Sequence, residues 1–218
     1  MRFLSQSSNT NLRRGASAAT TLLALGLCVF LANCGATHPV HYYTLETMPS
    51  APAQAQTVYP ITLVVGHITT PLLYRDDRLV FGNGTVELGA DFYNRWAETP
   101  ASMIESMLLD DLRATGAFRS VQLQSSNAKA DYIVRGRLSA FNEVDNGGNV
   151  AARFVIEFEL YQPKTGAVVW TAPPYAHDEP VNGKATTAVV EALQTNVRAG
   201  LQQVTSSITQ YFAGHPAQ

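Results

Sequence analysis

The chain has 218 residues, of which 46% are hydrophobic and 15% charged, with 15 Lys and Arg against 17 Asp and Glu. This composition indicates a globular protein with a real core. The weak acidity, without any basic block, argues against nucleic-acid binding and against broad electrostatic adhesion to anionic lipid.

The first 33 residues differ in composition from the rest of the chain. Three arginines precede a mostly apolar run at residues 16–32, which closes on Leu31-Ala32-Asn33-Cys34. The run is near the upper length of a secretory signal and short for a spanning helix. We therefore expect a lipoprotein signal peptide (1–33), cleaved before Cys34, whose thiol is acylated. Asn33 departs from the usual small residue, and an uncleaved anchor helix or a different cleavage site are the alternatives.

The predicted mature chain, residues 34–218, is long enough for one domain. Loss of three arginines leaves 12 Lys and Arg against 17 Asp and Glu, a net charge of about −5. Cys28 leaves with the signal and Cys34 carries lipid, so no thiol remains for a disulfide or a metal site. The residue after the cysteine is Gly35, whereas Asp at this position would favour retention in the inner membrane. By resemblance to known lipoprotein sorting, Gly35 indicates that the lipoprotein is sorted to the outer membrane.

The first part of the body contains several short apolar segments. Residues 41–45 predict a strand near the anchor, and residues 48–56, rich in Pro, Ala and Gln, predict a connector. Residues 61–68 are almost continuously apolar and predict a buried strand. Residues 79–88 predict a hairpin, because Asn83-Gly84 tolerate positive φ at a turn.

A helix near 99–115 follows. Thr99 suits the N-cap, Pro100 the first turn and Gly116 the position after the last turn. A strand is expected at residues 118–123. One apolar stripe at helical spacing joins Ile104, Met107, Leu108 and Leu112.

Residues 132–144 and 149–161 alternate between apolar and polar side chains around Asn146-Gly147-Gly148, which predicts a long hairpin. A turn centred near Gly147 places Arg137 opposite Glu157 and Arg135 opposite Glu159, and such cross-strand pairs contribute roughly 0.2–1 kcal/mol each. The expected core face of this hairpin comprises Val134, Leu138, Phe154, Ile156, Phe158 and Leu160.

The last part of the chain predicts a strand at 167–171, a polar loop at 173–183 and a long helix near 184–212. Strands, a helix, antiparallel strands and a second helix together predict an α+β domain, with a mixed or antiparallel sheet packed by two main helices and a core within about residues 41–212. The stripe of the long helix consists of Val190, Leu193, Val197, Leu201, Val204, Ile208 and Tyr211.

Enzyme motifs for hydrolases, nucleotide binding and zinc proteases do not occur. His177-Asp178-Glu179 is the most metal-like cluster, but one His and two consecutive carboxylates do not converge easily on one ion, so we interpret it as loop polarity. Asp76-Asp77 beside two arginines indicates salt bridging. We therefore expect no enzyme activity and no metal or cofactor. Tyr43 and Trp96 fit either core packing or a partner surface.

Several segments resemble a known family, among them Arg78-Leu79-Val80-Phe81, Ala130-Asp131-Tyr132 and four others. The four others are Tyr42-Tyr43-Thr44-Leu45, Leu73-Tyr74-Arg75, the block from Tyr93 to Pro100, and Thr115-Gly116-Ala117-Phe118. Trp96-Ala97-Glu98-Thr99-Pro100 before a helix is the most specific of them. The chain resembles the ABC-type transport auxiliary lipoprotein family, from Tyr42 to the last helix.

The resemblance implies a non-catalytic accessory subunit on the periplasmic face of the outer membrane. Its implied partners are mammalian-cell-entry (MCE) proteins and ABC transporter components that carry phospholipid between membranes, and a homo-oligomer is plausible because members form rings. We expect the partner surface at Arg75, Tyr93, Arg95 and Trp96. A periplasmic lipid carrier, or a structural envelope lipoprotein or cell-wall enzyme activator, is the alternative function.

Overall fold

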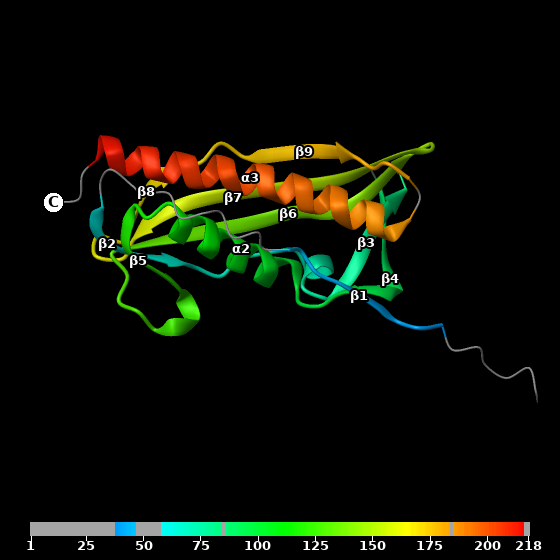
Figure 1. The fold of residues 1–218 in the computed structure, drawn as a ribbon, viewed down its shortest axis with the longest axis horizontal. Helices are drawn as coiled ribbons and strands as arrows, with labels where there is room; N and C mark the ends of the chain where they lie inside the picture. The colour runs from blue at the N-terminus through cyan, green and yellow to red at the C-terminus, as the bar shows by residue number, and fades with distance from the viewer. Residues whose placement is uncertain (1–37, 47–57, 84–85, 184, 216–218) are drawn as a thin grey trace, which may run out of the picture. The chain divides into compact units, whose positions relative to one another are not determined.

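The structure is a computed structural model that describes residues 38–46, 58–83, 86–183 and 185–215. The predicted signal peptide, Cys34 and the connector at 48–56 lie outside these residues. Residues Val40–Gln218 belong to one compact unit. Its described part is a mixed sheet of nine strands with two long helices packed on it (Figure 1), which confirms the α+β fold.

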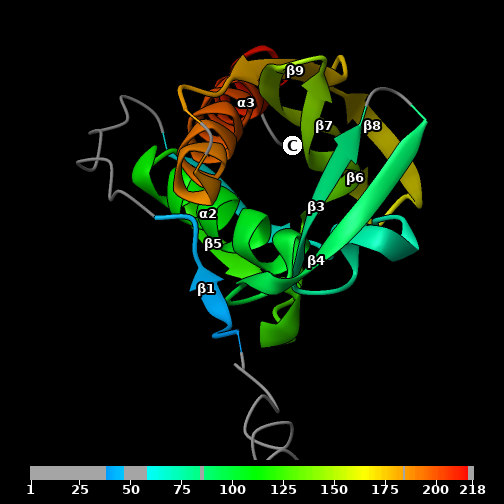
Figure 2. The same ribbon diagram turned by 90° about the vertical axis from the view of Figure 1, so that its right-hand side faces the viewer.

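The sheet has the strand order β1-β4-β3-β6-β2-β5, and β7 extends it by pairing with β6, β8 and β9. Parallel pairs join β1 to β4 and join β2 to both β5 and β6, and β3 also runs parallel to β6. The sheet curls around the helices (Figure 2). The strands are β1 (His41–Tyr43), β2 (Tyr59–Val65), β3 (Arg78–Asn83), β4 (Glu87–Trp96), β5 (Phe118–Leu123), β6 (Tyr132–Asn146), β7 (Asn149–Gln162), β8 (Ala167–Thr171) and β9 (Tyr175–Pro180).

The β6–β7 hairpin forms the centre of the sheet in the predicted register. Arg137 lies opposite Glu157 and Arg135 opposite Glu159, and the second pair forms an ion pair of 3.6 Å. Gly147 and Gly148 form the turn with φ of 70° and 98°, values that favour glycine. All six residues of the predicted core face are buried.

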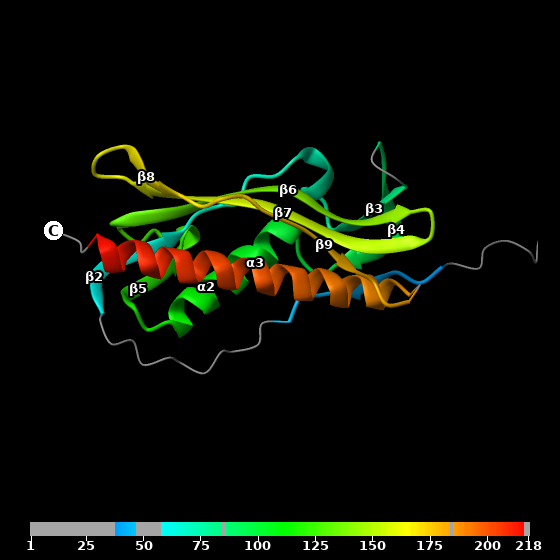
Figure 3. The same cartoon turned by 90° about the horizontal axis from the view of Figure 1, so that it is seen from above.

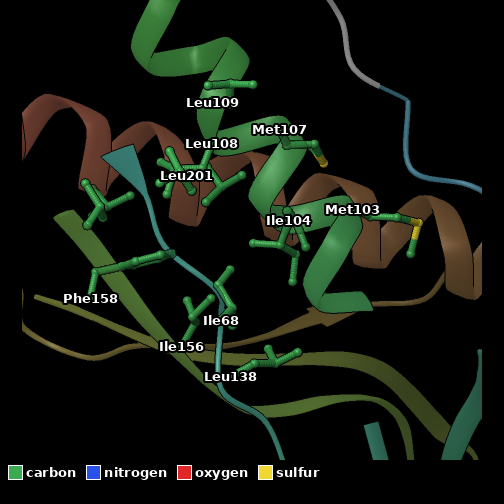
Figure 4. Packing of buried hydrophobic residues seen from close by; sticks show 14 of the residues in the cluster. Ile68, Met103, Ile104, Met107, Leu108, Leu109, Leu138, Ile156, Phe158 and Leu201 are labelled. Atoms are coloured by element: carbon green, nitrogen blue, oxygen red, sulfur yellow. The ribbon is translucent and has the colours of Figure 1, made fainter. Parts of the chain in front are cut away.

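Helix α2 (Pro100–Ala114) begins and ends where its caps predict. The Thr99 hydroxyl accepts a hydrogen bond from the Ser102 amide at 3.4 Å, and Gly116 follows the helix with φ of 62°. Its apolar stripe packs on Ile68, Leu138, Ile156 and Phe158 (Figure 4), so this helix closes the core over β6 and β7.

Helix α3 (Thr186–Gly214) lies along β7 and β9 beside α2 (Figure 3). Asn196 is fully buried on it and donates hydrogen bonds of 2.9 Å to the carbonyls of Ala152 and His177, while its Oδ1 accepts from the Tyr175 hydroxyl at 2.8 Å. Two short 3-10 helices complete the fold, η1 (Leu72–Tyr74) and η2 (Gln124–Ser126).

The predicted loop at 173–183 instead contains strand β9, antiparallel to β7. Its sequence, Tyr-Ala-His-Asp-Glu-Pro, lacks apolar alternation because four of its six residues are exposed and none is buried. Asp178 accepts two hydrogen bonds from Arg153, at 2.8 and 2.7 Å, across the strand pair. The strand is therefore fixed by β7 and by Asn196 of α3, which are distant in sequence and could not be predicted from local residues.

Candidate interaction surface

The polar cluster at His177 does not form a metal site in the structure. Within strand β9, His177 Nε2 lies 3.2 Å from Glu179 Oε2, while Asp178 is held by Arg153. Across the described part of the chain, no three His, Cys, Asp or Glu side chains gather where they could hold an ion. Likewise, none of the described helices combines the length and hydropathy needed to cross a membrane.

Trp96 is a core residue. Only 1% of it is exposed, and its ring lies 5.2 Å from the ring of Phe141. Tyr43 also packs against the core, with its hydroxyl donating to Asn94 Oδ1 at 3.1 Å. Of the two interpretations open for these aromatic residues, the structure favours core packing. Trp96 can therefore act on a partner only by positioning the end of β4.

The other three residues of the predicted partner surface are accessible. Tyr93 is 46% exposed and Arg75 is exposed beside η1. Arg95 is half-buried, and its Nη1 donates to Asp77 Oδ1 at 2.8 Å. Tyr93 and Arg95 lie on the last part of β4, where β1 pairs with it, so the structure brings them to the place at which the chain enters the domain.

A bend in β4 determines how these side chains are displayed. The Asp91 carboxylate accepts hydrogen bonds from the amides of Tyr93 and Asn94, at 2.7 and 3.0 Å, and from Asn94 Nδ2 at 2.8 Å. Partial burial raises the pKa of Asp91, but these hydrogen bonds outweigh that effect and hold the pKa below its usual range. The bend leaves the intervening Phe92 69% exposed.

Two exposed aromatic rings and two half-buried arginines lie beside this bend, and we name them the aromatic edge (Tyr42, Arg78, Phe92 and Arg95). Tyr42 lies opposite Arg95, and Arg95 opposite Arg78, so their side chains share one face of the sheet. The Arg78 guanidinium lies 5.9 Å from the centre of the Phe92 ring. Sequence reasoning missed Phe92 as a surface residue, and the turn-forming Asp91 was the signal that could have found it.

Among the hollows formed by the described residues are two that border the sheet. The larger, about 600 Å³, lies over the outer face of β6 and β7 and is bordered by Arg135, Arg137, Glu157 and Glu159. Its two arginines and two glutamates balance in charge. The smaller, about 200 Å³, lies between β3 and the start of α3, where Glu143 meets apolar residues. Burial, and then the nearby Asp145, raise the pKa of Glu143.

The fold places this protein in the α+β class. The chain belongs to the family of ABC-type transport auxiliary lipoprotein components, whose family model matches residues 43–208. Members of that family are auxiliary components of ABC-type transport. A search of curated proteins finds no match.

Solved structures share this fold. A Xanthomonas campestris protein of the DUF330 family has 17% sequence identity and a TM-score of 0.71, over 81% of this chain and 99% of its own. An uncharacterized protein has 15% identity and a TM-score of 0.59, over 80% of this chain and 99% of its own. At these identities the likeness shows the fold alone.

Proposed function

We propose that this protein is a lipoprotein on the periplasmic face of the outer membrane and a non-catalytic docking subunit of an MCE-type, ABC-driven system for phospholipid transport between membranes. The observation that carries the proposal is the family match over residues 43–208. Acyl chains on Cys34 would hold the domain at the membrane, since each buried CH₂ contributes about 0.8 kcal/mol.

The partner surface in this proposal consists of Arg75, Tyr93 and Arg95. Tyr93 and Arg95 lie on the last part of β4, where β1 pairs with it, whereas Arg75 follows η1. The buried Trp96 fixes the end of β4. An aromatic ring beside arginines is a combination common at protein interfaces. The rigid sheet would thus present these residues to an MCE protein while the anchor limits the distance from the membrane.

Recovery of the MCE protein with this chain from detergent-solubilised membranes tests the proposal. Arg75→Ala with Tyr93→Ala should lower recovery, because interface aromatic and arginine residues carry much of the binding energy. Lys164 is an exposed cation in the β7–β8 turn, and Lys164→Ala is the control, which should leave recovery unchanged. Failure of the unaltered chain to recover any MCE or ABC component would contradict the proposed function.

A further inference from the structure

The aromatic edge is exposed beyond what the fold needs. Tyr42 is 66% exposed and Phe92 69% exposed, whereas their neighbours Tyr43 and Trp96 point into the core. Alternation along β1 turns Tyr42 outward and Tyr43 inward, and the bend at Asp91 turns Phe92 outward on β4, so an outer aromatic pair is separated from an inner one. The outer pair contributes little to the core, so its apolar surface is available to something outside the domain.

Electrostatics limit what that partner can be. Arg78 pairs with Asp76 at 2.7 Å and Arg95 with Asp77 at 2.8 Å, so the arginines of the edge are already neutralised. The edge therefore offers aromatic rings among paired charges rather than a net positive patch. Rings with polar neighbours suit the boundary between lipid headgroups and acyl chains.

The short stretch of chain between the predicted anchor and Tyr42 also supports a lipid contact. Tyr42 follows Cys34 by eight residues, which span at most about 29 Å when fully extended. Helix α3, with 29 residues, is about 43 Å long. If Cys34 is acylated, this length keeps Tyr42 within about 29 Å of the lipidated residue, whereas the far end of α3 can lie farther from the bilayer.

We propose that the aromatic edge rests on the lipid surface as a second, non-covalent membrane contact beside the acylated Cys34. This inference depends on the lipid anchor of the proposed function. Tyr42 and Phe92 enter the headgroup region of zwitterionic lipid, and the paired arginines stay at its aqueous boundary. Two points of attachment restrict the rotation of the domain about its anchor.

Fluorescent labelling tests this contact directly, because the predicted mature chain has no cysteine besides Cys34. The lipidated mature chain carrying Phe92→Cys would be labelled with an environment-sensitive dye and reconstituted in phosphatidylcholine vesicles. The matched control is Val168→Cys, 48% exposed on β8 and at the other end of the domain from β1 and β4 (Figures 1 and 3). Nitroxide-bearing lipids should quench the dye at position 92 and leave the dye at position 168 unaffected.

Two other results would overturn the inference. Equal, water-like emission at both positions would show that the edge does not touch lipid. Shielding at position 92 without quenching by nitroxide lipids would identify a protein contact, with a second copy or another subunit. Flotation of the unlabelled chain with vesicles reports the anchor separately, so loss of flotation contradicts acylation of Cys34 rather than the edge.

A second measurement does not need the anchor. The full mature chain with Cys34→Ser should bind phosphatidylcholine vesicles weakly, and Tyr42→Ala with Phe92→Ala should lower its partitioning roughly tenfold or more, in line with the loss of two partly buried rings. Because the edge is neutral, raising salt should change partitioning little. Unchanged partitioning of a folded double variant would contradict the proposal.

Discussion

Single polar residues inside the core fix how the layers of this protein meet. The side-chain nitrogen of Asn196 donates to two carbonyls, and its side-chain oxygen accepts from one hydroxyl; these partners belong to β7 and β9. The buried amide is therefore hydrogen-bonded through both its nitrogen and its oxygen. Periodicity marks its helix face as apolar and gives no sign of an amide there, because its partners come from strands more than 15 residues away. Trp96 was equally ambiguous in sequence, since an aromatic residue before a helix fits a core or a surface.

Asn196→Ala should lower the free energy of unfolding by about 2 kcal/mol, because it leaves the carbonyls of Ala152 and His177 buried without a donor. Urea denaturation measures the change. Thr195→Ala, exposed on the same helix, is the control and should stay close to the unaltered protein. Equal stability of both variants would show that the carbonyls find other donors.

Glu143→Gln should stabilise the fold at neutral pH. The pKa of Glu143 is raised in the folded state by burial and by Asp145, so the unaltered protein loses stability as pH rises from the ordinary glutamate pKa, about 4.3, through the raised value. The glutamine variant lacks this loss, and its advantage should vanish below that range. Thermal melting of both proteins at a series of pH values measures how this stability difference changes with pH. A glutamine variant whose advantage is largest in acid would contradict the prediction.

At the scale of elements, local signals predicted most of the fold. The caps of α2, the stripe of α3 and the register of the β6–β7 hairpin follow from residues close in sequence. Strand β9 could not be predicted from nearby residues, because its pairing with β7 involves Arg153, which lies 25 residues before Asp178. The parallel pairs of β1, β2 and β3 were beyond local reasoning for the same reason. The bend in β4 required the hydrogen bonds of Asp91.

Asp178→Asn should loosen β9 specifically. The hydrogen bonds from Arg153 lower the pKa of Asp178, so in the unaltered protein their contribution is present above the ordinary aspartate pKa and is lost as pH falls through the lowered value. We expect a loss of about 0.5–1 kcal/mol at neutral pH. Amide hydrogen exchange should rise in β9 and not in β8, and a uniform rise would contradict a local role.

Gly200→Ala should destabilise the protein by about 1–3 kcal/mol, although alanine favours helices, because a methyl group there lies 3.0 Å from the rings of Phe154 and Tyr175. Gly214→Ala is the matched control. A methyl group at that position meets nothing within 4 Å, so the change should be neutral or slightly stabilising. Chemical denaturation of the two variants compares them, and a stabilising Gly200→Ala would show that α3 can move away from β7.

At the scale of the molecule, the described residues from Val40 onward form one folded unit, and its proposed role depends on where that unit is held. The family match was anticipated from short motifs, whereas the aromatic edge emerged only when β1, β3 and β4 were placed side by side. Its members are distant in sequence and belong to no shared motif.

Mass measurement of the mature N-terminal peptide should find Cys34 as the first residue and acylated. Cys34→Ser should abolish acylation and leave the signal uncleaved, so the protein should accumulate as a longer precursor instead of the lipidated mature form. Cys28→Ser is the control and should leave both results unchanged. An unmodified Cys34 in the membrane fraction would instead support an uncleaved N-terminal helix.

The pairing of β1 with β4 also decides how the domain bears mechanical load. β1 runs parallel to β4, so tension applied through its N-terminus acts along the strand and strains its hydrogen bonds together, in shear, rather than opening them one after another. Beyond β1, the backbone of Glu46 is held by Gln194 and Arg198 of α3. A pull on the N-terminal end of β1 is thus shared between the sheet and the long helix.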